Sequence, residues 1–287
     1  MRLLGLERGY VLVAGMALTP YAAATTWIPV LIALVLRRRA VALVSLAAAA
    51  GLVVVVAPRA VGGPQHGLPG GRHLSVMTAN LRFGQAEPGA LLELARKYDV
   101  DVLSLQELTP DAVPRLDAAG ARERFPHRIL DARPEARGSG IMSRLPLRDA
   151  RRSPPPGPAM PEATVIVPGA QPLHVKAVHP VAPSPGGMWR WVRDIDGLPQ
   201  ASPDGPVRVL IGDFNATLDH ARMRRLLASG YRDAAEVVGD GLHATYWVIQ
   251  IDHVLVDRRT RVTAAAFHDL PGSDHDAMTA TVALPAA

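Results

Sequence analysis

Apolar residues are distributed in two different ways along this chain of 287 residues. Residues 9–36 and 40–57 contain no charged side chain, and Arg37-Arg38-Arg39 separate the two runs. Because roughly 20 apolar residues cross the core of a bilayer, the first run is ample for a transmembrane helix and the second is just sufficient. The pattern therefore predicts a membrane anchor with two transmembrane helices over residues 1–58. The alternative is a buried helical hairpin within a water-soluble protein.

From residue 72 onward, short alternating and amphipathic segments replace the long apolar runs. Residues 59–71 are rich in Pro and Gly and are predicted to be a linker. Strands are expected at residues 73–79, 100–105, 140–143, 163–167, 173–178, 207–211, 251–256 and 277–283, and helices at 88–98, 110–119, 188–195 and 219–228. Because strands outnumber helices and many are consecutive, residues 72–287 are expected to form an α+β domain. Its predicted architecture is a four-layer α/β sandwich, two packed mixed β-sheets flanked by helices, preceded by the N-terminal transmembrane helical hairpin.

The charge and the cysteine content narrow the chemistry only slightly. The formal net charge is +5, and Lys97 and Lys176 are the only lysines among the basic residues, which are otherwise arginine. This excess suits an anionic partner such as phosphate, nucleic acid or lipid headgroups, and it equally suits a genomic bias toward arginine. The absence of cysteine excludes disulfides and thiolate metal sites.

Polar and ionisable side chains cluster at the ends of the predicted strands. The clusters are Asn80, Gln106-Glu107, His179, Asp213 with Asn215, Asp252, and Asp274-His275. Burial favours apolar residues at strand ends, so carboxylates, amides and imidazoles there need a specific reason. Oxygen ligands for a hard divalent cation, together with histidines that contact phosphate, would supply that reason.

The order of these clusters resembles that of the endonuclease/exonuclease/phosphatase superfamily, which has the deoxyribonuclease-I-like fold. The resemblance covers about residues 72–285 and depends chiefly on Gly-Asp-Phe-Asn at 212–215 and Ser-Asp-His at 273–275. More narrowly, Leu-Thr-Pro at 108–110 and Asn-Ala-Thr-Leu-Asp-His at 215–220 resemble the membrane-anchored bacterial branch. Residues 241–251 depart from the family, whose members usually have a longer loop with Trp-Pro, so the resemblance says least about substrate preference.

The resemblance implies a metal site and an activated water. Asn80, Glu107 and Asp274 would hold Mg²⁺ or Mn²⁺, and their oxygen donors suit a hard ion. Asp213 would orient or deprotonate the attacking water. Asn215 would donate a hydrogen bond to a phosphate oxygen.

The resemblance also implies a role for the histidines. His179 and His275 would contact the phosphate and stabilise the negative charge that develops in the transition state. Asp252 would hydrogen-bond His275 and favour its protonated form. His253 points to the opposite face of the strand from Asp252 and is predicted to be structural.

Ordinary structural explanations exist for several of these residues. Asn80 could form a turn, and Asp213 with Asn215 could cap a helix. His179 could end its strand without touching substrate. Thr217 or Asp219 is expected to cap the helix over residues 219–228. Only the complete, ordered set favours catalysis.

The implied function is that of a membrane-tethered, divalent-metal-dependent phosphoesterase. It would hydrolyse phosphodiester or phosphomonoester bonds, in the manner of a nuclease, by in-line attack of an activated water, on nucleic acid or another phosphate ester. The alternatives are a phospholipid or inositol-phosphate phosphoesterase at the membrane surface and a catalytically lapsed binding domain. No protein partner is indicated. Because the short connector Arg37-Arg38-Arg39 is positively charged, it is predicted to be cytoplasmic, in a multi-pass protein of the cell membrane whose catalytic domain is extracytoplasmic.

Overall fold

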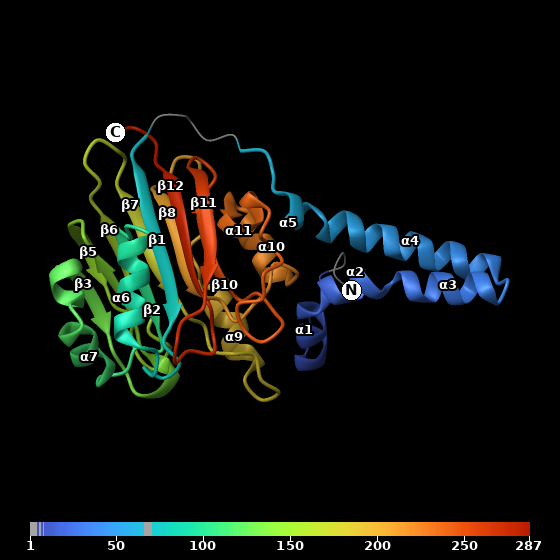
Figure 1. The fold of residues 1–287 in the computed structure, drawn as a ribbon, viewed down its shortest axis with the longest axis horizontal. Helices are drawn as coiled ribbons and strands as arrows, with labels where there is room; N and C mark the ends of the chain where they lie inside the picture. The colour runs from blue at the N-terminus through green and yellow to red at the C-terminus, as the bar shows by residue number, and fades with distance from the viewer. Residues whose placement is uncertain (1–4, 6, 8, 66–70) are drawn as a thin grey trace.

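Two six-stranded β-sheets packed face to face form the centre of the computed structural model, which describes residues 5, 7, 9–65 and 71–287 (Figure 1). The first sheet has the order β11 (Arg261–His268), β12 (Ala277–Ala283), β1 (His73–Asn80), β2 (Val102–Gln106), β4 (Ser139–Ser143) and β3 (His127–Asp131). The second has the order β5 (Leu147–Arg151), β6 (Glu162–Val165), β7 (Leu173–Val178), β8 (Val207–Asp213), β10 (Asp252–Asp257) and β9 (Tyr231–Asp233). The predicted pair of packed mixed sheets is confirmed.

Each sheet contains one parallel pair near its middle, β1 with β2 and β7 with β8, and antiparallel pairs elsewhere. In the register of the first pair, Asn80 lies opposite Gln106. In the second pair, Val178 lies opposite Gly212. Parallel strands end at the same edge of a sheet, so the polar residues that end or follow these four strands meet at one end of the sandwich.

The core divides into three apolar layers that follow from the strand and helix patterns. Residues such as Val76, Ile211 and Val254 are fully buried between the two sheets. The helices α6 (Pro88–Lys97), α7 (Ala112–Ala118) and α8 (Ala121–Arg124) cover the outer face of the first sheet. The helices α9 (Met188–Asp196) and α10 (Ala221–Ala228) cover part of the outer face of the second sheet. Helices on both outer faces complete the predicted four layers.

The strands that the apolar pattern failed to predict all lie toward the edges of the sheets. They are β3, β5, β9 and β11. In β5, the four residues 148–151 are exposed, and in β3 only Ile129 is fully buried. A strand that buries few side chains has no clear alternation of apolar and polar residues, so its sequence carries little signal.

The N-terminal segment forms an apolar helical hairpin that projects from one side of the sandwich (Figure 1). Its helices are α1 (Tyr10–Ala17), α2 (Thr19–Thr25), α3 (Trp27–Val35), α4 (Arg39–Val56) and α5 (Pro58–Val61). Within the described residues, one helix, 39–61, is long and apolar enough to cross a membrane. A second span exists if residues 10–17 and 19–35, which meet at a bend of 60°, count as one. The transmembrane hairpin stays a prediction on these grounds.

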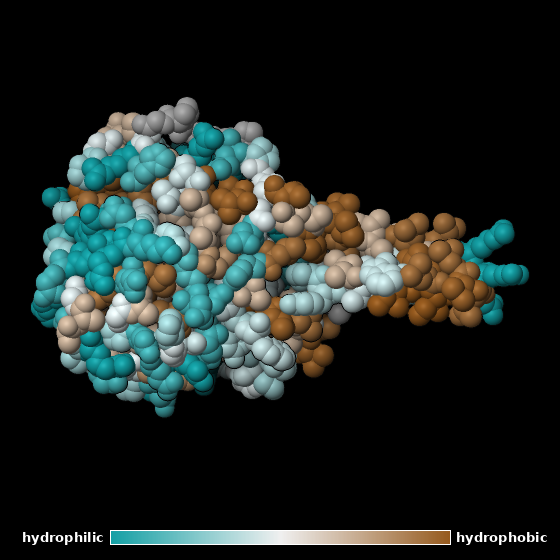
Figure 2. Space-filling view, in the orientation of Figure 1, coloured by the Kyte–Doolittle hydropathy of each residue, from teal (hydrophilic) through white to brown (hydrophobic). Residues whose placement is uncertain are grey.

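The surface of the hairpin is strongly apolar over its outer part, mixed apolar and weakly polar nearer the sandwich, and hydrophilic at its far tip (Figure 2). Side chains such as Trp27, Val35 and Val44 are exposed. Contiguous apolar surface of this extent is uncommon on water-soluble proteins and is typical of surfaces that contact lipid or another protein.

The base of the hairpin packs against the sandwich. Val13 of α1 is buried in the apolar layer that contains Trp191 and Met223. The segment predicted as a linker begins with α5, which packs on α11 (Ala234–Val238), while residues 66–70 of that segment lie outside the described residues. The buried guanidinium of Arg59 binds the Asp219 carboxylate through two hydrogen bonds of 2.9 and 2.8 Å.

The predicted cap of the helix over residues 219–228 is wrong. The helix α10 begins at Ala221, and His220, the N-cap residue before it, makes no side-chain capping bond. The carboxylate of Asp219 instead faces Arg59, which is 160 positions away in the chain. A long-range ion pair replaces the local cap that the sequence suggested.

Candidate functional site

A pocket of about 440 Å³ opens where the parallel strands of both sheets end. Its lining includes Phe83, Glu107, Arg137, His179, Asp213, Asn215, Tyr246, Asp274 and His275. Asn80 and Asp252 lie next to it and hydrogen-bond Asp213 and His275 respectively. The structure therefore brings together all eight residues singled out from the sequence, although the role of each stays a prediction.

The first sheet contributes Asn80 and Glu107 from neighbouring strand ends. Glu107 follows β2 with a φ of 54°, a left-handed conformation that is uncommon for residues other than glycine. Its Oε2 accepts a hydrogen bond of 2.7 Å from the backbone N–H of Phe83. The Asn80 amide donates to Glu107 Oε1 at 3.4 Å and to Asp213 Oδ2 at 3.1 Å. Asn80 thus connects the carboxylates of the two sheets.

The second sheet contributes a rigid loop that begins with Asp213. Asp213 Oδ1 accepts a hydrogen bond of 2.7 Å from the backbone N–H of Asn215, and Asn215 Nδ2 donates to the Pro180 carbonyl at 3.1 Å. Gly212 has a φ of 154°, and a Cβ there would lie 2.0 Å from the Val178 carbonyl oxygen. Because β8 approaches β7 this closely, only glycine fits at the position before Asp213.

A histidine and an aspartate form a hydrogen-bonded dyad beside Asp213. His275 Nδ1 lies 2.8 Å from Asp252 Oδ2, and His275 Nε2 lies 3.9 Å from Asp213 Oδ2. Burial by itself would lower the pKa of His275, but the charge and hydrogen bond of Asp252, with the charge of Asp213, raise that pKa to about 9. The imidazole therefore presents a positive charge to the pocket at neutral pH.

The pKa values of Asp213 and His179 are shifted in opposite directions. Burial raises the pKa of the Asp213 carboxyl, and the Asp252 charge raises it further, while His275 and His179 act in the other direction. Burial lowers the pKa of His179, whose Nε2 lies 3.8 Å from Asp213 Oδ2. A buried carboxylate of raised pKa, with imidazoles on two sides, is a suitable acceptor for the proton of a water molecule.

The donor set at the pocket fits a hard divalent cation. In the described part of the chain, Glu107 makes no salt bridge, so no arginine or lysine there neutralises its carboxylate. Asp274 is exposed and lies 3.8 Å from Arg82 Nε in a loose, solvent-exposed pair. Carboxylate and amide oxygens on Glu107, Asp274 and Asn80 are the ligand types that Mg²⁺ and Mn²⁺ prefer.

A second group of possible ligands lies deeper in the pocket. Oxygen and nitrogen atoms of Asp213, Asp252 and His275 lie within 4.8 Å of one another. His275 already uses Nδ1 in its bond to Asp252. With Nδ1 bonded to Asp252, the imidazole could offer a metal ion or a phosphate only its Nε2.

Several polar residues near the site do not line the pocket, and one of them, Ser104, connects the two sheets. Gln106 Oε1 accepts a hydrogen bond of 2.9 Å from Thr78, and Ser104 donates one of 3.0 Å to the Ile211 carbonyl of the other sheet. His253 lies 2.9 Å from Asp233 Oδ2 and 3.0 Å from the Ala216 carbonyl oxygen. The prediction that His253 is structural is confirmed.

Sequence reasoning assigned no role to Tyr246, which forms one wall of the pocket. Its ring lies 4.7 Å from the His275 ring, centroid to centroid. The available signal was its place in residues 241–251, the segment that departs from the family pattern. Without a motif, a lone tyrosine in a loop could not be assigned to the site.

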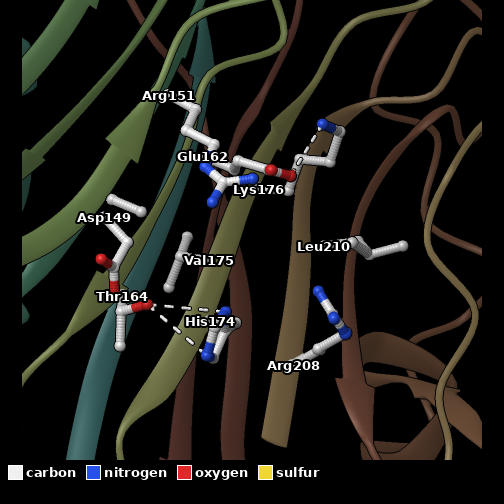
Figure 3. A pocket seen from close by; sticks show the side chains of 10 residues that line it. Asp149, Arg151, Glu162, Thr164, His174, Val175, Lys176, Arg208 and Leu210 are labelled. Carbon is white, nitrogen blue, oxygen red and sulfur yellow. Dashed lines mark hydrogen bonds and ion pairs between the residues drawn. The ribbon is translucent and has the colours of Figure 1, made fainter. Parts of the chain in front are cut away.

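Another pocket, of about 220 Å³, lies on the outer face of the second sheet (Figure 3). Its side chains come from β5, β6, β7 and β8 and mix both charges, with Lys176 paired to Glu162 at 3.1 Å. His174 lies beside the Thr164 hydroxyl, and burial lowers the pKa of that histidine. None of the eight residues singled out from the sequence lines this pocket, so it is not the candidate active site.

Comparisons with known proteins agree with this geometry. The model of the Endonuclease/Exonuclease/phosphatase family matches residues 77–275. A comparison with curated proteins finds no match. The chain is similar to an endonuclease/exonuclease/phosphatase from Beutenbergia cavernae DSM 12333, with 18% identity, a TM-score of 0.57, and coverage of 75% of this chain and 72% of that one.

Two other similar structures contain DNA. The D. rerio TDP2 complexed with single-strand DNA product has 20% identity and a TM-score of 0.58, over 73% of this chain and 98% of that one. The 3′ phosphatase NExo from Neisseria bound to a product DNA hairpin has 19% identity and a TM-score of 0.57, over 72% and 98%. Similarity at this identity establishes the shared fold.

Proposed function

The chain belongs to the Endonuclease/Exonuclease/phosphatase family, and we propose that it is a membrane-tethered, divalent-metal-dependent phosphoesterase. It hydrolyses phosphodiester or phosphomonoester bonds by in-line attack of a water molecule. The observation that carries this proposal is the position of the buried Asp213 carboxylate. Asn80 donates to it, and His179 and His275 flank it, within the pocket that Glu107 and Asp274 line.

The proposed metal site comprises Asn80, Glu107 and Asp274 and takes Mg²⁺ or Mn²⁺. When bound, the ion supplies a Lewis acid that neutralises charge on the phosphoryl oxygens. The backbone N–H of Phe83 holds one oxygen of Glu107, which limits the orientations of this carboxylate and preorganises it.

The other side chains of the pocket accept the proton of the water and bind the phosphate. Asp213 Oδ2 accepts the proton of the attacking water. The hydrogen bond from Asn80 and the neighbouring imidazoles fix the orientation of this carboxylate. The charged His275 donates from Nε2 to a phosphoryl oxygen, while Asp252 holds Nδ1. His179 and the Asn215 amide make further contacts with the phosphate. These donors stabilise the charge of the transition state because they are fixed before the reaction begins.

Two classes of substrate are consistent with the proposal. The DNA in the related D. rerio and Neisseria structures supports nucleic acid. The apolar hairpin supports a phosphoester in or on the membrane, the second class. The complete set of acidic, amide and imidazole groups at the pocket favours an enzyme over a lapsed binding domain.

The proposed tether is the hairpin over residues 9–57, in a membrane-anchored branch of the family. The helix over residues 39–61 and the bent pair before it supply the two spans. The positive connector Arg37-Arg38-Arg39 lies in the cytoplasm and the catalytic domain lies outside it. Because the chain has no cysteine, one introduced at exposed Arg148 can be labelled in intact cells by a membrane-impermeant maleimide. Labelling only after lysis would contradict this orientation.

A direct assay tests the activity. The full chain in detergent micelles, freed of metal with EDTA, is expected to hydrolyse neither bis(p-nitrophenyl) phosphate nor p-nitrophenyl phosphate. Addition of Mg²⁺ or Mn²⁺ is expected to restore hydrolysis of at least one. Activity that persists in EDTA, or no activity with either ion, would count against a metal-dependent phosphoesterase.

A further inference from the structure

Residues 241–250, here called the rim loop, lie between the hairpin and the active-site pocket. Their backbone is bonded to both arms of the hairpin. The Gly241 N–H donates to the Arg59 carbonyl at 3.0 Å, and the Tyr21 hydroxyl donates to the Val248 carbonyl at 2.8 Å. A cavity of about 190 Å³ between the hairpin and the rim loop is lined from both sides, by Tyr21 and Arg59 and by Leu242 and Val248 among others. The loop is therefore fixed beside the base of the hairpin.

The other side of the rim loop is bonded to the catalytic dyad. Thr245 Oγ1 accepts a hydrogen bond of 3.1 Å from the Asp252 N–H, and the Thr245 carbonyl accepts one of 2.9 Å from the Asp276 N–H. Tyr246 forms a β-bridge with His275, and the two rings lie 4.7 Å apart at a tilt of 32°. The same ten-residue segment thus contacts the hairpin and forms part of the pocket wall.

The tip of the rim loop exposes a tryptophan at a backbone position that suits glycine or asparagine. Tyr246 and Ile249 bond to each other across a tight turn, which leaves Trp247 and Val248 in its centre. Trp247 has a φ of 50° and is 85% exposed. A bulky residue in the left-handed region is strained, and the indole gains no compensating burial within the protein. The exposed indole is therefore available to a surface outside the chain.

A bilayer surface is the partner that fits. Tryptophan prefers the interface between lipid and water, where its apolar ring and its N–H are both accommodated. The exposed Leu242 adds apolar area to the same loop. The hairpin beside the loop also exposes apolar side chains, such as Trp27. Figure 2 shows apolar side chains over much of the hairpin, with paler side chains among them near the sandwich.

Two buried contacts keep the pocket in a constant position relative to the hairpin. Arg59 pairs with Asp219, and His220 Nε2 lies 3.0 Å from the Val13 carbonyl oxygen. Both Asp219 and His220 follow Asn215 of the active-site loop by only a few residues. A domain held at two points cannot turn freely about its tether, so the rim loop stays at the level where the hairpin leaves the sandwich.

We propose that the rim loop is a second membrane contact, through Trp247 and Leu242, and that it presents the active-site pocket to phosphoesters carried by lipids of the bilayer. The membrane contact depends only on the position and exposure of the loop. The substrate class rests on the proposed phosphoesterase function. A lipid phosphoester reaches the pocket past Tyr246, whose ring forms the wall nearest the loop tip.

A quenching experiment tests the membrane contact without any measure of activity. The full chain carries a single cysteine, Trp247→Cys or the control Arg148→Cys on exposed β5, labelled with an environment-sensitive fluorophore. Each protein is reconstituted in phosphatidylcholine vesicles that contain a lipid with a nitroxide near the interface. Stronger quenching of the label at position 247 than at 148 is the expected result. Equal quenching at the two positions would overturn the membrane contact.

A kinetic comparison tests the substrate class. Trp247→Ser is expected to lower hydrolysis of phosphatidic acid, phosphatidylinositol or a phosphoinositide in phosphatidylcholine vesicles about tenfold, because the interfacial burial of one indole is lost. Hydrolysis of soluble bis(p-nitrophenyl) phosphate is expected to stay unchanged. The matched control Trp189→Ser, which removes another exposed tryptophan, should alter neither rate.

The other outcomes separate the two proposals. Faster hydrolysis of plasmid DNA than of every lipid by the reconstituted wild-type chain would overturn the lipid substrate class. An equal effect of Trp247→Ser on vesicle and soluble substrates would do the same. If the wild-type chain hydrolyses nothing with Mg²⁺ or Mn²⁺, the phosphoesterase proposal and the lipid substrate class both fail, and the quenching result still decides whether the loop contacts the membrane.

Discussion

The guanidinium of Arg59 and the carboxylate of Asp219 form a buried pair, joined by two hydrogen bonds of 2.9 and 2.8 Å. Arg59 follows the last apolar run of the N-terminal hairpin, and Asp219 follows Asn215 of the active-site loop by four positions. Their side chains are 4% and 0% exposed, so water screens the interaction little. The pair makes the base of the hairpin a structural part of the two-sheet sandwich.

We expect Arg59→Met to destabilise the catalytic domain by about 3–5 kcal/mol, because the substitution removes the guanidinium that faces a buried carboxylate. Chemical denaturation of the full chain in detergent, followed by tryptophan fluorescence, would measure the loss. The matched control is Arg122→Met, which removes an arginine from the largely exposed pair with Asp117 and should cost less than about 1 kcal/mol. Similar losses in the two variants would show that the Arg59 pair contributes no more than a surface contact.

Glu107→Gln should weaken divalent-metal binding and lower kcat at least about 100-fold. Substitution of residues that only support metal ligands already lowers metal affinity or activity roughly 10- to 100-fold. The amide keeps the shape of the side chain and loses its charge, so the melting temperature should not fall. Titration calorimetry with Mn²⁺ would report binding separately from turnover. Undiminished Mn²⁺ affinity would remove Glu107 from the proposed metal site.

Asp213→Asn should lower kcat by roughly 10²–10⁴-fold with little change in KM, because an amide cannot accept the proton of the attacking water. Steady-state kinetics with bis(p-nitrophenyl) phosphate would measure both parameters. Asp149→Asn, which changes a carboxylate in the pocket of Figure 3, is the control and should behave as wild type. A variant at position 213 with full turnover would exclude the proposed role of Asp213.

The buried pair of His253 and Asp233 predicts a pH dependence of stability away from the metal site. Burial alone would lower the pKa of His253, but the hydrogen bond and charge of Asp233 raise it above the ordinary value of 6.5. The charged pair therefore stabilises the fold fully below pH 6.5, and this contribution is lost as the pH rises through the raised pKa. His253→Gln should remove this dependence.

Denaturation of the wild type and of His253→Gln at several pH values would check this prediction. The difference in unfolding free energy between the two proteins should be largest at mildly acidic pH and should shrink toward alkaline pH. A difference that grows with rising pH would have the wrong sign and would mean that His253 is neutral in the folded protein.

The local pattern of apolar and polar residues was enough to predict the buried strands. Short sequence motifs were enough to single out the candidate site residues. The central strands β1, β8 and β12 bury almost all of their residues, so their sequences carry a strong apolar signal. The motifs around Asp213 and His275 are short and contiguous, so they could be compared with a known family directly. Edge strands such as β5 bury little and left no comparable signal.

Only the tertiary structure decided which distant residues meet. Asp252 lies opposite Asp213 because β10 pairs with β8 in one register, and a shift by one residue would have turned His253 toward the pocket instead. Arg59 and Asp219 are 160 positions apart, and Tyr21 and Val248 are 227 apart. Periodicity reports which face of an element is buried, but contacts between elements depend on how all of them pack, and no local segment of the chain contains that information.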